Sequence, residues 1–173
     1  MLNKINFKSL YSSGESDSPI SFFTDALSNS ISFDLGLGFF SSASFNVLSI
    51  GFAKFISNGG KMRLYINQYL SEEDYEIFTS HPDIVENKVI DSFTSMLNVL
   101  TKRDKQFFNC LSYLIYTNRI EVKIVIPNSG GIAHQKFGIF TDAAKNKVSF
   151  IGSLNLTASA LLSKNIESIS CNS

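Results

Sequence analysis

Residues 132–169 read IAHQKFGIFTDAAKNKVSFIGSLNLTASALLSKNIESI. Apolar and polar side chains alternate over residues 132–140, which is the pattern of a β-strand. The polar run at 142–147 predicts a tight connection, and the apolar residues at 148–151 predict a returning strand. We therefore expect residues 132–140 and 147–152 to form adjacent antiparallel strands of a β-hairpin.

The polar side chains of this hairpin suit the chemistry of phosphate esters. His134 and Lys136 would point to the same face of the first strand, because they are two residues apart. Gly152 allows backbone to approach a bound group, and Ser153 and Asn155 emerge just after the second strand. An imidazole can attack phosphorus or carry a proton, while lysine and asparagine can hold the non-bridging oxygens. These residues form the predicted catalytic and phosphate-binding site.

Further positions bear on this site. Residues 156–162 predict a short helix, whose N-terminus favours an anion. Glu167 could hydrogen-bond the second imidazole nitrogen and so fix its tautomer. Asp142 is expected to be structural and to close the hairpin turn rather than to take part in the reaction. Asn165 fits either a site residue or the end of the helix.

The spacing His134-x-Lys136 followed by Gly152-Ser153-x-Asn155 resembles the HxK…GSxN signature of the phospholipase D superfamily. In that family the histidine is the nucleophile and a glutamate downstream of GSxN supports it. The resemblance therefore implies the fold, the nucleophile and the phosphate-binding residues together.

The same resemblance assigns two acidic positions. Glu167 matches the supporting glutamate. The family pattern places a mostly structural aspartate five residues after the lysine, where Thr141 stands in this chain, and Asp142 follows one residue later.

No paired acidic cluster lies near the motifs to hold a divalent ion, so we expect neither a metal nor another cofactor.

The chain contains a single HxK unit. One histidine must attack phosphorus while a second protonates the leaving oxygen, and one imidazole cannot lie on both sides of an in-line displacement. The resemblance implies a homodimer in which each copy gives His134, Lys136 and Asn155 to one shared cleft.

A narrower resemblance rests on three stretches. Residues 32–41 (SFDLGLGFFS), residues 59–78 (GGKMRLYINQYLSEEDYEIF) and the hairpin stretch are similar to the phospholipase-D-like region at the N-terminus of restriction-type superfamily II helicases. The similarity extends over about residues 20–170. It implies a nuclease module of a restriction or defence system, with an attached or associated helicase.

The charge is unevenly distributed along the chain. The 173 residues have a formal net charge of zero, but residues 101–173 carry 9 Lys or Arg against 4 Asp or Glu. A polyanion-binding face would have this bias, and so would a solvated lysine-rich hairpin. We expect DNA as the partner, no stable membrane insertion and a cytoplasmic location, because the sequence lacks both a long apolar run and a signal pattern.

The rest of the chain predicts an α/β fold of one domain. Its mixed sheet is expected to be phospholipase-D-like, largely parallel at its centre and flanked by helices. Residues 1–19 are expected to be a mobile N-terminal segment with little core, and residues 20–173 the domain, truncated at its C-terminus if the resemblance holds. Periodicity predicts helices at 20–27, 43–56, 71–79, 84–103 and 105–118, and strands at 30–40, 62–66 and 119–126.

Three functions fit these observations. The first is a metal-independent phosphodiesterase that cleaves DNA through a phosphohistidine intermediate. The second is a lipid phosphodiesterase, although the chain shows no basic amphipathic helix of the kind that lies on a membrane. The third is a catalytically idle domain that binds nucleic acid or mediates dimers for a helicase. The presence of His134, Lys136, Ser153, Asn155 and Glu167 favours the first over the third.

Overall fold

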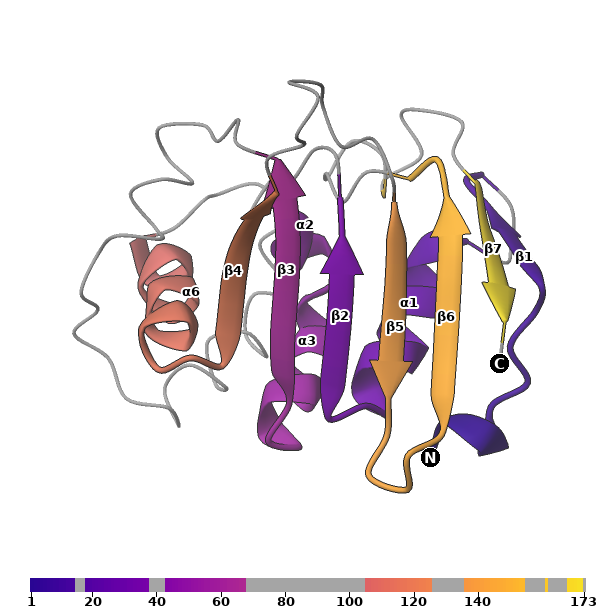
Figure 1. Ribbon diagram of the computed structural model, residues 1–173, viewed down its shortest axis with the longest axis horizontal. Helices are drawn as coiled ribbons and strands as arrows, with labels where there is room; N and C mark the ends of the chain where they lie inside the picture. The colour runs from indigo at the N-terminus through magenta and orange to yellow at the C-terminus, as the bar shows by residue number, and fades with distance from the viewer. Residues whose placement is uncertain are drawn as a thin grey trace.

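The computed structural model describes residues 1–14, 18–37, 43–67, 105–125, 136–154, 161 and 168–172. Within these residues the strands form one seven-stranded sheet in the order β1-β7-β6-β5-β2-β3-β4. Helices α1, α2 and α3 lie along one face of the sheet, and α6 lies beside β4 (Figure 1). The elements are η1 (Leu2–Lys4), β1 (Leu10–Ser12), α1 (Pro19–Ser28), β2 (Ser32–Gly36), α2 (Ala43–Val47), α3 (Ser49–Ser57), β3 (Lys61–Asn67), α6 (Lys105–Tyr116), β4 (Ile120–Val125), β5 (Phe137–Thr141), β6 (Lys147–Gly152) and β7 (Ser168–Asn172).

The sheet is mixed, and its direction changes at β2. Strands β2, β3 and β4 run parallel to one another, while β2 pairs antiparallel with β5, as do β5 with β6, β6 with β7 and β7 with β1. The β2–α2–α3–β3 segment is the crossover that parallel neighbours require. The predicted fold class is confirmed: a mixed α/β sheet, partly parallel at its centre, flanked by helices.

Helix α1 begins at a proline that follows a capping serine. Ser18 has an extended backbone, and its hydroxyl accepts a hydrogen bond from the Ser21 N–H at 3.5 Å. Pro19 at the first helical position lacks the N–H that would otherwise need a partner. The buried face of the helix is Phe22, Phe23, Ala26 and Leu27. The helix predicted at 20–27 is therefore confirmed, one residue longer at each end.

The helix predicted at 43–56 is wrong as a single element. The chain leaves helical geometry at Leu48 (φ −96°, ψ 17°), so α2 and α3 are separate helices. The bend buries Phe45 and Phe52 with their ring centroids 4.4 Å apart. Helix α3 ends at Ser57 and is followed by the C-cap Asn58 and by Gly59, whose positive φ of 78° suits a residue without a side chain.

Phenylalanine rings fill the space between the sheet and α1. Phe33 and Phe140 are direct partners in the β2–β5 ladder, and their rings stack with centroids 4.0 Å apart. Phe22 meets Phe140 and Phe150 edge to face, each at 5.8 Å. This cluster fixes α1 beneath β5 and β6, the two strands of the predicted hairpin.

The expectation that residues 1–19 add little to the core is wrong for Leu2 and Tyr11, which are only 1% and 7% exposed. Strand β1 pairs antiparallel with β7, with Leu10 opposite Ser170. A three-residue strand is too short to show periodicity, so only the pairing with β7 reveals it. The mobility predicted for this segment stays a prediction.

The remaining predicted elements lie partly outside the described residues. The strands at 30–40, 62–66 and 119–126 correspond to β2, β3 and β4, and the helix at 105–118 to α6. The helices predicted at 71–79 and 84–103 lie outside the described residues, and of the helix predicted at 156–162 only Leu161, which is helical and buried, is described.

Candidate active site

The β5–β6 hairpin is the scaffold of the candidate site. Phe137 pairs with Ile151 and Thr141 with Lys147, so the predicted antiparallel pairing is confirmed for 137–141 and 147–152. Gly138 and Phe140 are buried toward the helices, whereas Phe137 and Ile139 are exposed on the other face. Strand β5 begins one residue after Lys136, and the rest of the strand predicted at 132–140 lies outside the described residues.

The two motifs meet at one end of this hairpin. The Gly152 N–H donates a hydrogen bond to the Lys136 carbonyl at 3.1 Å. The last residue of HxK and the first of GSxN are therefore direct neighbours, although sixteen residues separate them in the chain. Lys136 is half-buried and Ser153 is exposed.

Strand β7 lies against the second motif. The Ser153 N–H donates to the Ser168 carbonyl at 3.2 Å, and the Ser168 N–H donates to the Ser153 hydroxyl at 3.4 Å. A Cβ placed on Gly152 would lie 2.3 Å from the Ser168 carbonyl oxygen and 2.9 Å from the Ile169 Cα. The sequence interpretation gives Gly152 a role in admitting a bound group; in the structure, the backbone of β7 makes this close approach.

We expect Gly152→Ala to destabilise the protein by about 1–3 kcal/mol, the usual cost of overpacking against backbone that cannot move freely. The displaced β7 should also lower phosphodiester cleavage. The measurements are the urea midpoint and the nicking rate of plasmid DNA. Ile151→Ala is the matched control, because Ile151 is the preceding residue and is 65% exposed. Equal midpoints for the two variants would contradict the expectation.

Asp142 directly follows β5 and lies in the turn between β5 and β6, at the opposite end of the hairpin. Figure 1 shows this turn at the end of the hairpin that is far from the start of β5. One carboxylate oxygen accepts from the N–H groups of Ala144 and Asn146, each at 2.9 Å. The other accepts from the Asn146 side-chain amide and from the Leu2 N–H, also at 2.9 Å. Asp142 thus holds the turn and ties η1 to it, and it is far from Lys136 along β5.

These contacts make the stability depend on pH. The Asn146 amide, helped by the three backbone N–H groups, lowers the pKa of Asp142 despite its burial. A lowered folded-state pKa stabilises the fold above the ordinary carboxyl range of about 4, and the contribution is lost as the pH falls through the lowered value. We expect Asp142→Asn to lower the urea midpoint at pH 7, with the difference from the unaltered protein shrinking in acid. Asp25→Asn, at an exposed carboxylate of α1, is the control; a difference that persists unchanged in acid would contradict this assignment.

Three predicted site residues, His134, Asn155 and Glu167, lie outside the described residues, as does Asn165. The structure brings together Lys136, Gly152 and Ser153 and places Asp142 at the other end of the hairpin. The sequence interpretation missed the contact of Ser153 with Ser168, which directly follows Glu167 in the chain.

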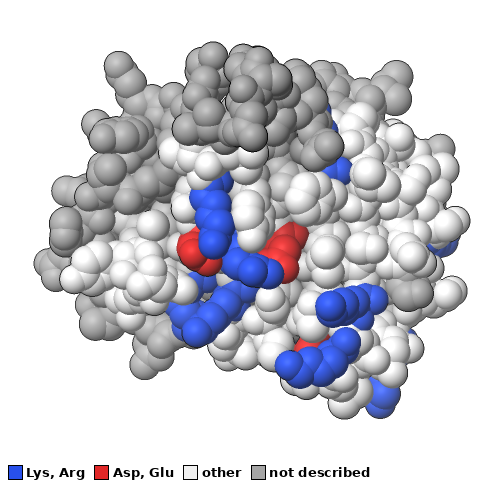
Figure 2. All heavy atoms as spheres, viewed as in Figure 1, with Lys and Arg blue, Asp and Glu red and all other residues white. Residues whose placement is uncertain are grey.

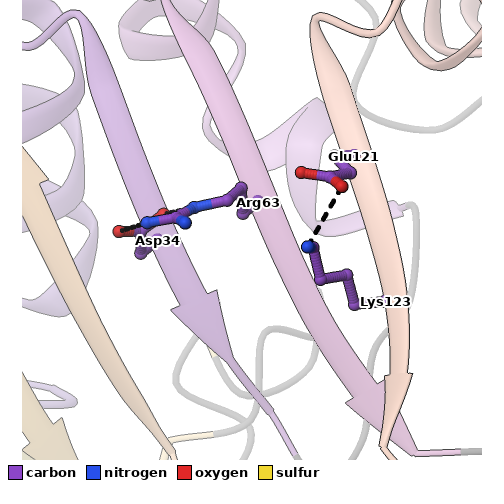
Figure 3. A network of polar contacts seen from close by, with 4 residues as sticks. All are labelled: Asp34, Arg63, Glu121 and Lys123. Carbon is purple, nitrogen blue, oxygen red and sulfur yellow. Dashed lines mark hydrogen bonds and ion pairs between the residues drawn. The ribbon is translucent and has the colours of Figure 1, made fainter.

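The interpretation also missed a polar network on the face of the sheet opposite α1 (Figure 3). The Arg63 guanidinium donates from Nε and Nη2 to the two carboxylate oxygens of Asp34, each at 2.6 Å. This pairing raises the pKa of Arg63. Lys123 pairs with Glu121 at 3.1 Å on the neighbouring strand. Alternation along β2, β3 and β4 predicts that these charged side chains lie on an exposed face of each strand. Only the order of the strands shows that they are neighbours.

In the part of the chain that the structure describes, no three His, Cys, Asp or Glu side chains gather as metal ligands would. Among the helices of these ranges, none has the length and apolar character needed to cross a membrane.

No protein-family model and no curated protein matches the chain. Solved structures similar to it include two nucleases. NucT from Helicobacter pylori has a TM-score of 0.49 and 15% sequence identity, covering 88% of this chain and 75% of NucT. Nuc from Salmonella typhimurium, a phospholipase D family member, has a TM-score of 0.53 and 13% identity, covering 94% of this chain and 79% of Nuc. At this identity the similarity is one of fold: the chain has the fold of a phospholipase D family member.

Proposed function

We propose that this protein is a metal-independent phosphodiesterase and that it serves as the DNA nuclease module of a restriction or defence system. One observation carries the proposal: the hydrogen bond from the Gly152 N–H to the Lys136 carbonyl joins the HxK and GSxN motifs at one end of the sheet. The fold shared with Nuc supports the same reading.

The proposed reaction has two steps. A nitrogen of His134 attacks phosphorus, the N–P bond forms, and the bond from phosphorus to the leaving oxygen breaks. Lys136 and Asn155 stabilise the charge on the non-bridging oxygens, and Glu167 orients the ring through its other nitrogen. Water then attacks the phosphohistidine, the N–P bond breaks to release the imidazole, and the proton of the water passes to the second imidazole, which is neutral once it has protonated the leaving oxygen. The contact between Ser153 and Ser168 supports this set, because it joins GSxN to the residue next to Glu167.

The leaving oxygen needs a proton from a second imidazole. We assign it to His134 of a second copy, so that two copies share one cleft about a two-fold axis. An ordinary histidine pKa of about 6.5 lets one imidazole be neutral and the other protonated near neutral pH. We place this dimer in the cytoplasm, attached to or associated with a helicase.

The excess of basic residues in the second half of the chain favours DNA over lipid. Supercoiled plasmid, bis-p-nitrophenyl phosphate and phosphatidylcholine vesicles, each offered in EDTA, test this choice. We expect nicking of plasmid in EDTA and a steep loss of DNA affinity with salt, with a slope of about −0.9 per duplex phosphate contacted. Hydrolysis of lipid alone, salt-insensitive DNA binding, or activity that EDTA abolishes and magnesium restores would each contradict the proposal.

A further inference from the structure

The ladder between β6 and β7 ends on a side chain in place of a backbone acceptor. Its last pair is Gly152 with Ile169, and the next pair along these antiparallel strands is Ser153 with Ser168. Half of the regular exchange is present, because the Ser153 N–H donates to the Ser168 carbonyl at 3.2 Å. The returning bond runs from the Ser168 N–H to the Ser153 hydroxyl at 3.4 Å, where a regular ladder uses the backbone carbonyl. The hydroxyl therefore continues the ladder by one residue.

The peptide unit that this hydroxyl holds is the one that joins Glu167 to Ser168. A peptide unit is planar, so a hydrogen bond to its N–H restricts the orientation of the whole unit. Ser153 bonds both the N–H and the carbonyl of Ser168 and so holds that residue at two points. A residue of the GSxN motif thereby restricts the direction in which the chain runs from Ser168 to Glu167.

Strand β7 is a fixed support for this peptide unit, because it lies between β1 and β6. On the β6 side it contacts Gly152 so closely that an added Cβ would lie 2.3 Å from the Ser168 carbonyl oxygen. On the β1 side Tyr11 pairs with Ile169, and both residues are buried. A change at Ser153 should therefore leave β7 on the sheet and loosen its first residue.

Charge contributes little to the position of β7. Strands β6 and β7 contain one charged residue between them, Lys147, at the end of β6 that is far from Ser153. Figure 2 shows a largely white surface over β7, on the right of the view, while charged side chains gather over the middle of the sheet and below it. Hydrogen bonds and close packing between these strands are thus what position Ser168.

We propose that Ser153 is a positioning residue, which holds Glu167 in place to orient the imidazole of His134. The sequence interpretation counts Ser153 among the phosphate-binding residues, whereas its hydroxyl accepts from the backbone next to Glu167. The inference rests on the proposed function and deepens it. The GSxN motif acts on the ring of the nucleophile, through Ser153 and Glu167, as well as on the phosphate.

The first measurement is the hydrolysis of bis-p-nitrophenyl phosphate in EDTA. We expect Ser153→Ala to lower kcat roughly 3-fold to 30-fold and to leave KM nearly unchanged, because a misplaced imidazole slows the chemical step without removing a phosphate contact. Ser153→Thr keeps a hydroxyl and should restore most of the lost kcat. The matched control is Ser149→Ala, which removes a hydroxyl that donates to the Asn172 carbonyl at 3.5 Å between the same two strands. It should leave kcat unchanged.

A double-mutant cycle tests whether Ser153 acts through Glu167. In a chain that already carries Glu167→Ala, no carboxylate remains to be positioned. Ser153→Ala should then lower kcat by less than about 2-fold further, because two residues that act as one unit are not additive. A hydroxyl that contacts the phosphate directly would instead cost its full factor in both backgrounds.

The tautomer of His134 gives a readout that needs no turnover. The chain has two histidines, so isotope-labelled histidine gives two imidazole signals in nitrogen NMR, and His81→Ala assigns them. At a pH above the ordinary histidine pKa of about 6.5, we expect a single tautomer of His134 in the unaltered protein. Ser153→Ala and Glu167→Ala should each give a mixture of tautomers, whereas Ser153→Thr and Ser149→Ala should retain the single one.

Three results would overturn the inference. They are a raised KM with unchanged kcat in Ser153→Ala, a full further loss of kcat in the Glu167→Ala background, and a tautomer of His134 that Ser153→Ala leaves unchanged. If the tautomer depends on Ser153 and Glu167 but the protein cleaves no phosphodiester, only the proposed function is contradicted. If the protein cleaves phosphodiesters and the tautomer does not depend on Ser153, only this inference is contradicted.

Discussion

His134→Ala is expected to lower the rate of plasmid nicking by roughly 10³-fold or more, because it removes the proposed nucleophile. The other proposed groups bind phosphate or orient the ring, and none of them replaces a covalent step. The measurement is nicking of supercoiled plasmid in EDTA. The matched control is His81→Ala, at the only other histidine of the chain, which we place outside the site.

The covalent intermediate gives this prediction a second readout. The protein is allowed to react with a short labelled oligonucleotide, and the reaction is quenched in alkali to preserve phosphohistidine. The label should then migrate with the protein on a denaturing gel. His134→Ala should remove the labelled protein band, and His81→Ala should retain it. A band that survives in His134→Ala would place the nucleophile on another residue.

A mixed dimer with one His134→Ala subunit is expected to retain less than about a tenth of the activity of the unaltered dimer. Each dimer has one shared cleft in the proposed arrangement, so the loss of one imidazole removes either the nucleophile or the acid. If each subunit had an independent site, the mixed dimer would keep half of the activity. Differently tagged subunits, co-expressed and purified through both tags, provide the sample for the nicking assay.

The control for the mixed dimer carries His81→Ala in one subunit and should behave like the unaltered dimer. Mixed His134→Ala dimers that keep half or more of the activity would contradict the shared cleft. That result would not test the assignment of His134 as the nucleophile, which depends on the experiment with the single variant.

Local sequence determined the hairpin and the first helix. The alternation after residue 136, the polar turn and the alternation of 147–152 are properties of short segments, and β5 and β6 follow them. Ser18 and Pro19 define the start of α1 in the same way, because capping involves residues only three apart. The HxK and GSxN motifs can be recognised in the sequence because each lies within a few residues. They are adjacent because the register of one tight hairpin pairs their ends.

Contacts between distant segments decided what the sequence did not show. The Leu2 N–H reaches Asp142 across 140 positions, and β1 is a strand only because β7 lies beside it. The sequence predicts that Gly152 admits a bound group, whereas in the structure the backbone of β7 makes the close approach to it. The break at Leu48 likewise has no marker in the apolar spacing.

The positions of Tyr65 and Phe137 show the same limit most clearly. Each of β2, β3 and β5 alternates, so the sequence determined that Tyr65 and Phe137 each lie on one face of a strand. Whether they share a face, and whether a glycine lies between them, depends on strand order and register. Periodicity along a strand is set by backbone geometry within a few residues, whereas pairing across the sheet is set by the packing of the whole chain, and only the tertiary structure fixes it.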